Sequence, residues 1–97
     1  YDTALEYLNR SLSIQQEIGD SEGLCTTLFN LGQTHERKGD RTYAESVLVS
    51  SYRLAIQMNL SEILKALGVL APHFGLPEGL AGWEMLAKQM DEQQEQS

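Results

Sequence analysis

The chain has 97 residues, enough for one small domain, and 14 acidic residues against seven basic ones give it a net charge of −7. This charge argues against nucleic-acid binding, which needs clustered lysine and arginine, and it favours a neutral or basic partner surface unless it serves only solubility. The single cysteine, Cys25, excludes an internal disulfide and a cysteine-based zinc site, and no apolar run is long enough to cross a membrane.

Apolar residues at helical spacing predict a first helix over residues 1–18. One stripe of that helix carries three leucines: Leu5, Leu8 and Leu12. Gly19 suits the left-handed residue that ends a helix, and Ser21 is expected to cap the next helix. That second helix should reach residue 37 or 38, where basic residues suit the negative end of the helix dipole.

Gly39 and Asp40 form a second stop-and-cap signal, which predicts a third helix over residues 41–58. Its inward face is expected to carry apolar and small residues: Ala44, Val47, Leu48, Ser51, Leu54, Ala55 and Met58. Asn59 is expected to end this helix in place of a glycine.

Ser61 is expected to cap a fourth helix, which Pro72 should end early because proline disfavours helical geometry in the residue before it. Residues 73–77 then form a loop, and a fifth helix is predicted over residues 80–90. The chain shows no strand-like alternation of apolar and polar residues, so we expect an all-α protein of about five helices.

The first helix and the third are related by an internal repeat of 40 residues. The matching positions are Ala4 and Ala44, Leu8 and Leu48, Ser11 and Ser51, Ile14 and Leu54, and Ile18 and Met58. Within the second and third helices, the positions typical of a tetratricopeptide repeat (TPR) are occupied by Leu28, Leu31, Gly32, His35, Gly39, Asp40, Ala44, Leu48 and Ser51. The chain therefore resembles this family, and the spacing is similar to the long-helix subclass found in kinesin light chain and bacterial TPR regulators.

The resemblance implies antiparallel helix–turn–helix repeats wound into a right-handed superhelix. In this scheme residues 1–93 form one repeat domain. Residues 1–18 are the second helix of a truncated repeat, residues 21–58 a complete repeat and residues 61–93 a degenerate one. We expect residues 94–97 to form a disordered tail, and we expect the chain to be a segment of a longer protein.

In this family the first helix of each repeat lines a concave groove that binds a partner. The positions that this implies here are Thr26, Phe29, Asn30, Gln33, Glu36, Arg37, Glu62, Lys65, Ala66 and Val69. Asn30 either hydrogen-bonds a bound peptide backbone or is only a surface polar residue. Phe29 either anchors a partner or packs on the neighbouring helix, and Trp83 either closes the apolar end of the stack or marks an interface.

No set of residues indicates catalysis, a cofactor or a metal ion. The sequence indicates no general base near Cys25 that could activate its thiol, so we expect Cys25 to be a small packing residue. Glu62 and Ala66 stand where a carboxylate clamp for chaperone tails would need basic residues, so we do not expect that ligand.

These observations favour a non-enzymatic, cytoplasmic module of a scaffold or regulatory protein that binds a protein or peptide and neither nucleic acid nor membrane. The alternative is a self-association module. The first helix, at the end of the stack, lacks a partner along one apolar stripe, and that exposed stripe could pair with a second copy of the chain.

Overall fold

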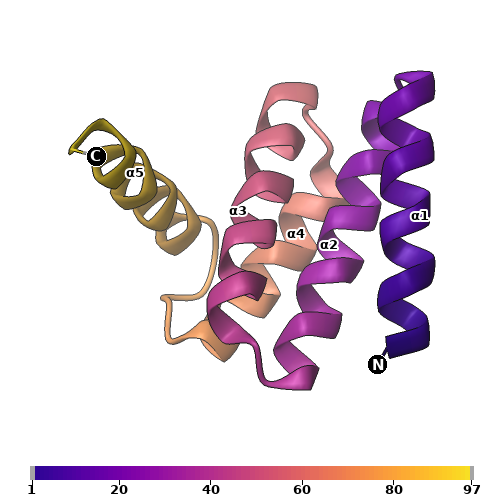
Figure 1. Cartoon of the computed structure of the whole chain (residues 1–97). Coiled ribbons are helices and arrows are strands. Elements are labelled where there is room, and N and C mark those ends of the chain that lie inside the picture. Colours follow the sequence, from indigo (N-terminus) through magenta and orange to yellow (C-terminus); the bar gives the residue numbers. More distant parts are fainter. Residues whose placement is uncertain (1, 97) are drawn as a thin grey trace.

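The structure, a computed structural model, describes the backbone of residues 2–96 and the side chains of residues 2–93 (Figure 1). Its elements are α1 (Asp2–Ile18), α2 (Ser21–Lys38), α3 (Arg41–Met58), α4 (Ser61–Leu70), the short 3-10 helix η1 (Ala71–Phe74) and α5 (Ala81–Gln96). The predicted all-α class and the five predicted helices are confirmed, and the described residues contain no strand.

The first three helices lie side by side and alternate in direction, with α2 in the middle (Figure 1). Two-residue turns join them, and Gly19 and Gly39 adopt the left-handed conformation there, with φ of 74° and 98°. Asn59 ends α3 in the same conformation with φ of 58°, as predicted. Such short turns can only return the chain beside the helix that precedes them, which makes neighbours antiparallel.

Aspartate side chains cap α2 and α3: Asp40 was predicted and is confirmed, whereas Asp20 takes the place of the predicted Ser21. The carboxylate of Asp20 accepts a hydrogen bond of 3.0 Å from the amide of Gly23, and Asp40 accepts one of 3.2 Å from Tyr43. Ser21 is already inside α2, so the prediction that it caps this helix is wrong. Ser61 is likewise the first residue of α4, whose capping position falls on Leu60, a side chain that cannot accept a hydrogen bond.

The buried face of α3 follows the prediction in all but its last turn. Ala44, Leu48 and Ala55 are fully buried against the neighbouring helices. Ser51 is also buried, and its hydroxyl donates a hydrogen bond of 3.0 Å to the Cys25 carbonyl of α2. Met58 was predicted to point inward but is 38% exposed, because it lies in the last turn of α3 at the edge of the stack.

The chain changes direction after α4. The helix ends at Leu70, as Pro72 predicted, but Ala71–Phe74 continue as η1, so the expected loop over residues 73–77 begins two residues late. Proline fits here because the first turn of a helix needs no amide donor and suits the fixed φ of proline.

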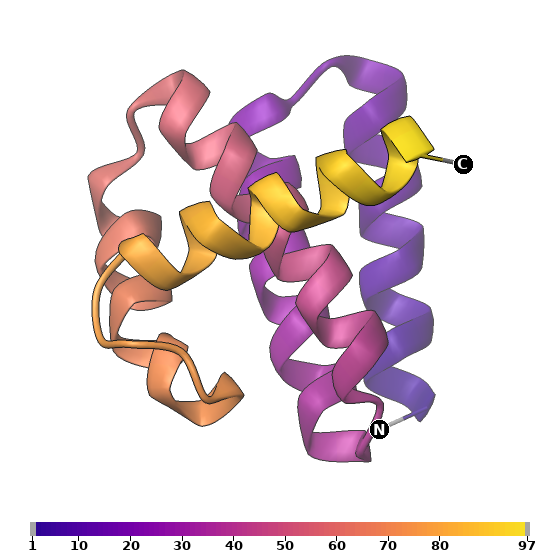
Figure 2. The same ribbon diagram turned by 90° about the vertical axis from the view of Figure 1, so that its left-hand side faces the viewer.

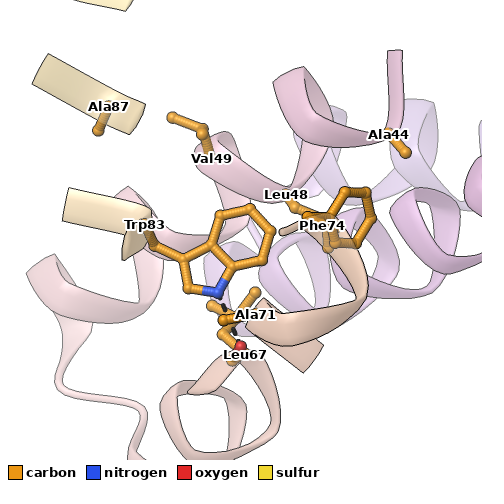
Figure 3. Packing of buried hydrophobic residues seen from close by; sticks show 8 residues of the cluster. All are labelled: Ala44, Leu48, Val49, Leu67, Ala71, Phe74, Trp83 and Ala87. Atoms are coloured by element: carbon orange, nitrogen blue, oxygen red, sulfur yellow. Dashed lines mark hydrogen bonds between the residues drawn. The ribbon is translucent and has the colours of Figure 1, made fainter. Parts of the chain in front are cut away.

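The indole of Trp83 joins α5 to α4 in the core. Trp83 is fully buried, and its ring nitrogen donates a hydrogen bond of 2.7 Å to the Leu67 carbonyl (Figure 3). Around it lie the buried residues of one cluster: Ala44, Leu48, Val49, Leu67, Ala71, Phe74 and Ala87. Of the two readings of Trp83, closure of the apolar end of the stack is therefore confirmed.

The last helix departs from the hairpin geometry expected for a degenerate repeat over residues 61–93. Instead of lying antiparallel to α4, α5 crosses α3 at a steep angle and packs mainly against it (Figure 2). Arg53 of α3 holds this crossing through hydrogen bonds to the Ala87 carbonyl and to Asp91. The backbone of residues 94–96, expected to be disordered, continues α5, and glutamate and glutamine are good helix formers; Ser97 lies outside the described residues.

Candidate partner-binding groove

A groove runs between α2 and α4 and contains two hollows in line. The apolar hollow, of about 540 Å³, is lined by Phe29, Gln33, Glu36, Arg37, Ala66, Val69, Leu70 and His73. The acidic hollow, of about 430 Å³, is lined by Glu22, Thr26, Asn59, Leu60, Ser61, Glu62 and Ile63. The first turns of both helices meet at the acidic hollow and their last turns at the apolar one, so α2 and α4 run in the same direction.

The spacing of residues along α2 produces its wall of the groove. Thr26, Phe29, Gln33 and Arg37 follow each other at intervals of three or four residues, which places them on one helix face. Leu31 lies on the opposite side of α2 and Cys25 on one flank, and both are buried against the neighbouring helices. The packing of α2 therefore leaves this stripe facing the groove.

The floor of the apolar hollow exposes hydrocarbon to solvent. Val69 is 69% exposed, while Phe29 and Leu70 are half-buried and pack on the core cluster beneath. Exposed apolar surface loses contact with water when another apolar group covers it, which contributes about 25 cal/mol for each Å² buried. The hollow can thus bind an apolar side chain.

Polar groups surround this floor at the end where α2 finishes. Gln33, Glu36, Arg37 and His73 supply an amide, a carboxylate, a guanidinium and an imidazole. Arg37 forms no ion pair with any described residue. The wall beyond it is held in place by Arg41, which donates a 3.0 Å hydrogen bond to the His73 carbonyl and lies over the Phe74 ring at 5.5 Å.

The acidic hollow carries two glutamates related by the 40-residue repeat. Glu22 and Glu62 lie in the first turns of α2 and α4, where the positive end of each helix dipole favours a carboxylate. Both are exposed, and neither forms an ion pair within residues 2–93. This end of the groove therefore presents negative charge to an incoming partner.

Most of the residues expected on the inner face line one of the two hollows: Thr26, Phe29, Gln33, Glu36, Arg37, Glu62, Ala66 and Val69. Asn30 lines neither, being exposed at the margin of the stripe. Lys65 lines a third hollow of about 600 Å³ with Leu64, Gly68 and Leu80, and Val69 lines this hollow as well as the apolar one. Asn30 and Lys65 thus line neither hollow of the groove, and any role of theirs in binding stays a prediction.

Several lining residues were absent from the sequence-based set. In the acidic hollow these are Glu22, Asn59, Leu60, Ser61 and Ile63, and in the apolar hollow they are Leu70 and His73. Leu70 and His73 close the apolar hollow where α4 passes into η1. The helical spacing from Ala66 leads to Leu70 and would have indicated it. His73 had no such signal, because its position depends on the turn that Pro72 starts.

Cys25 lies in the interior away from this groove. Its thiol is fully buried and 3.3 Å from the Ser51 carbonyl. Burial raises the pKa of the Cys25 thiol, against a smaller opposing effect of the Ser51 hydroxyl, so the reactive thiolate is disfavoured. The prediction that Cys25 is a packing residue is confirmed.

Neither a membrane-spanning helix nor a cluster of metal ligands is found among the described residues. No helix of residues 2–96 is both long and apolar enough to span a membrane. No group of three or more metal-ligating side chains comes together in the same part of the chain.

Comparison with known proteins gave one match. A family model described as tetratricopeptide repeat matches residues 1–57, which span α1, α2 and all but the end of α3. No curated protein and no solved structure matched significantly.

Proposed function

The chain belongs to the tetratricopeptide repeat family, and on that premise we propose that it binds a peptide or helix of a partner protein in the groove between α2 and α4. Repeats of this family are generally non-catalytic protein-interaction modules. The proposed setting is a scaffold or regulatory protein of the cytoplasm.

The exposure of Val69 on the floor of the apolar hollow carries this proposal. An apolar side chain that is 69% exposed, beside a half-buried phenylalanine and a polar rim, has the character of an interface core. One partner side chain of the size of leucine, fully buried there, contributes about 1.5–3 kcal/mol. Such a contribution is a large share of a micromolar affinity, which corresponds to about 8 kcal/mol.

The test selects phage-displayed random peptides on the immobilised full chain and measures their affinity for two variants. Val69→Glu places a charge on the floor of the hollow, and we expect it to weaken binding about tenfold or more. Met85→Glu is the matched control, because Met85 is 57% exposed on α5 and lines none of the hollows described above. Equal affinities for Val69→Glu and the wild type would show that the groove is not the binding site.

A second candidate function is self-association through the outer face of α1. Tyr7, Ile14 and Ile18 are 71%, 57% and 69% exposed. They repeat, 40 residues earlier, the positions of Val47, Leu54 and Met58 in α3. The first two of these pack inward in α3, so the face has the pattern of a packing surface.

A second copy of the chain suits this face when the two α1 helices pair antiparallel. The stripe consists of Tyr7, Ser11, Ile14 and Ile18, at intervals of four, three and four residues, which is the heptad spacing of a helix–helix seam. Arg10 and Glu17 flank this stripe with opposite charges. Antiparallel pairing brings Arg10 of one copy near Glu17 of the other. Light scattering should then show a dimer at micromolar concentrations that Ile14→Glu converts to monomer; a wild-type monomer throughout would exclude this function.

A further inference from the structure

We infer that the segment bound in the groove carries a basic side chain and a large apolar side chain about four residues apart along an extended chain. This inference rests on the proposed function and specifies its ligand. It draws on two properties of the groove, namely the distribution of its charges and the separation of its two hollows.

The unpaired charges of the groove are distributed unevenly between its two ends. Glu22 and Glu62 are exposed at the acidic hollow, where no basic side chain of residues 2–93 pairs with either of them. Arg37 lies at the far end, beyond the apolar floor, and it too has no ion-pair partner among those residues. Glu36 shares that end, so its net charge is near zero while that of the acidic hollow is −2.

This distribution selects the chemistry of the partner. A lysine or arginine of the partner gains attraction from the two glutamates at the acidic hollow, whereas at the other end the guanidinium of Arg37 offsets the carboxylate of Glu36. The basic side chain therefore belongs over Glu22 and Glu62, and the apolar side chain over Phe29 and Val69. The net charge of −7 on the whole chain acts in the same direction by attracting basic segments at long range.

The spacing follows from helix geometry. On α2, the acidic hollow is centred near residue 24 and the apolar hollow near residue 33, a separation of about nine residues or about 13 Å at 1.5 Å per residue. An extended chain covers that length in about four residues at about 3.3 Å each. Side chains alternate in direction along such a chain, so residues four apart point the same way and can enter both hollows together.

The experiment uses the peptides selected on the full chain. Among them, we expect lysine or arginine to be enriched about four residues from leucine, isoleucine, phenylalanine or methionine. The double variant Glu22→Gln and Glu62→Gln should weaken these peptides about three- to tenfold, the effect of losing two exposed ion pairs. Glutamine keeps the size of the side chain and is a good helix former, so the variant should fold, as circular dichroism will show.

The control is Glu6→Gln with Glu92→Gln, which removes the same charge from exposed positions outside the groove. Its affinity should match that of the wild type, and the effect of the groove variant should shrink as salt is added. Two results would overturn the inference alone, provided that Val69→Glu still weakens binding. One is that the selected peptides lack the basic residue, and the other is that both double variants lose the same affinity. Failure to select any peptide, or indifference to Val69→Glu, would overturn the proposed function itself.

Discussion

Gly32 sets the distance between α2 and α3. A Cβ atom built at this position would lie 2.4 Å from Cγ and 2.6 Å from Cδ2 of Leu48, far inside normal contact distance. Leu48 is fully buried and cannot move away freely. On the opposite helix Ala44 is also completely buried, so small residues on both helices allow their close approach.

Gly32→Ala should therefore lower the free energy of unfolding by about 1–3 kcal/mol, the usual cost of overpacking a core. This loss is expected although alanine gains about 1 kcal/mol over glycine in helix propensity. Urea denaturation measures it. In a Leu48→Ala background, where the clash is removed, Gly32→Ala should lower the free energy of unfolding by less, or raise it. An unchanged or higher stability of Gly32→Ala alone would contradict the close contact.

The helices follow one another every 20 residues, and the turns differ in how they are capped. Asp20 and Asp40 occupy equivalent places and both bond to the third residue of the helix that follows. At the third equivalent place stands Leu60, and α4 has no side-chain cap. The shorter α4 thus begins with less local stabilisation and depends on burial of Leu67 and on the contact with Trp83.

Replacing either aspartate cap by alanine should cost about 1 kcal/mol, because one amide in the first turn of the helix loses its acceptor. Chemical denaturation of Asp20→Ala and Asp40→Ala will show this. Ser61→Ala is the matched control, since Ser61 provides no cap, and it should stay within about 0.5 kcal/mol of the wild type. A control as costly as the aspartate variants would mean that Ser61 does cap α4.

At the scale of the molecule, α3 connects two apolar clusters. Val47 packs with Leu5 and Leu31 on the side of α1, while Leu48 and Val49 belong to the larger cluster around Trp83. The crossing of α5 over α3 covers the far end of the stack (Figure 2). This covered end contrasts with the outer face of α1, which leaves Tyr7 and Ile18 in solvent.

Because α3 takes part in both clusters, the chain should unfold in a single transition. Trp83 is the only tryptophan and is fully buried, so its fluorescence reports on the cluster around α5, whereas far-ultraviolet circular dichroism reports on all helices. We expect the urea midpoints of the two signals to coincide. A loss of helix signal before the change in fluorescence would show that α1 unfolds separately.

The five helices, the turns between the first four and about half of the groove lining could be predicted from the sequence. These features are local, since helical spacing, a glycine or asparagine in the left-handed conformation and a nearby proline act within a few residues. The capping positions at residues 20 and 60 were missed by one place: Asp20 reaches the free amide of Gly23, and at Leu60 no side chain caps the helix. The tertiary structure was needed to establish the crossing of α5 over α3 and the place of His73 in the groove. Both depend on the path through η1 and on the burial of Trp83 against Leu67, contacts between residues that no local pattern relates.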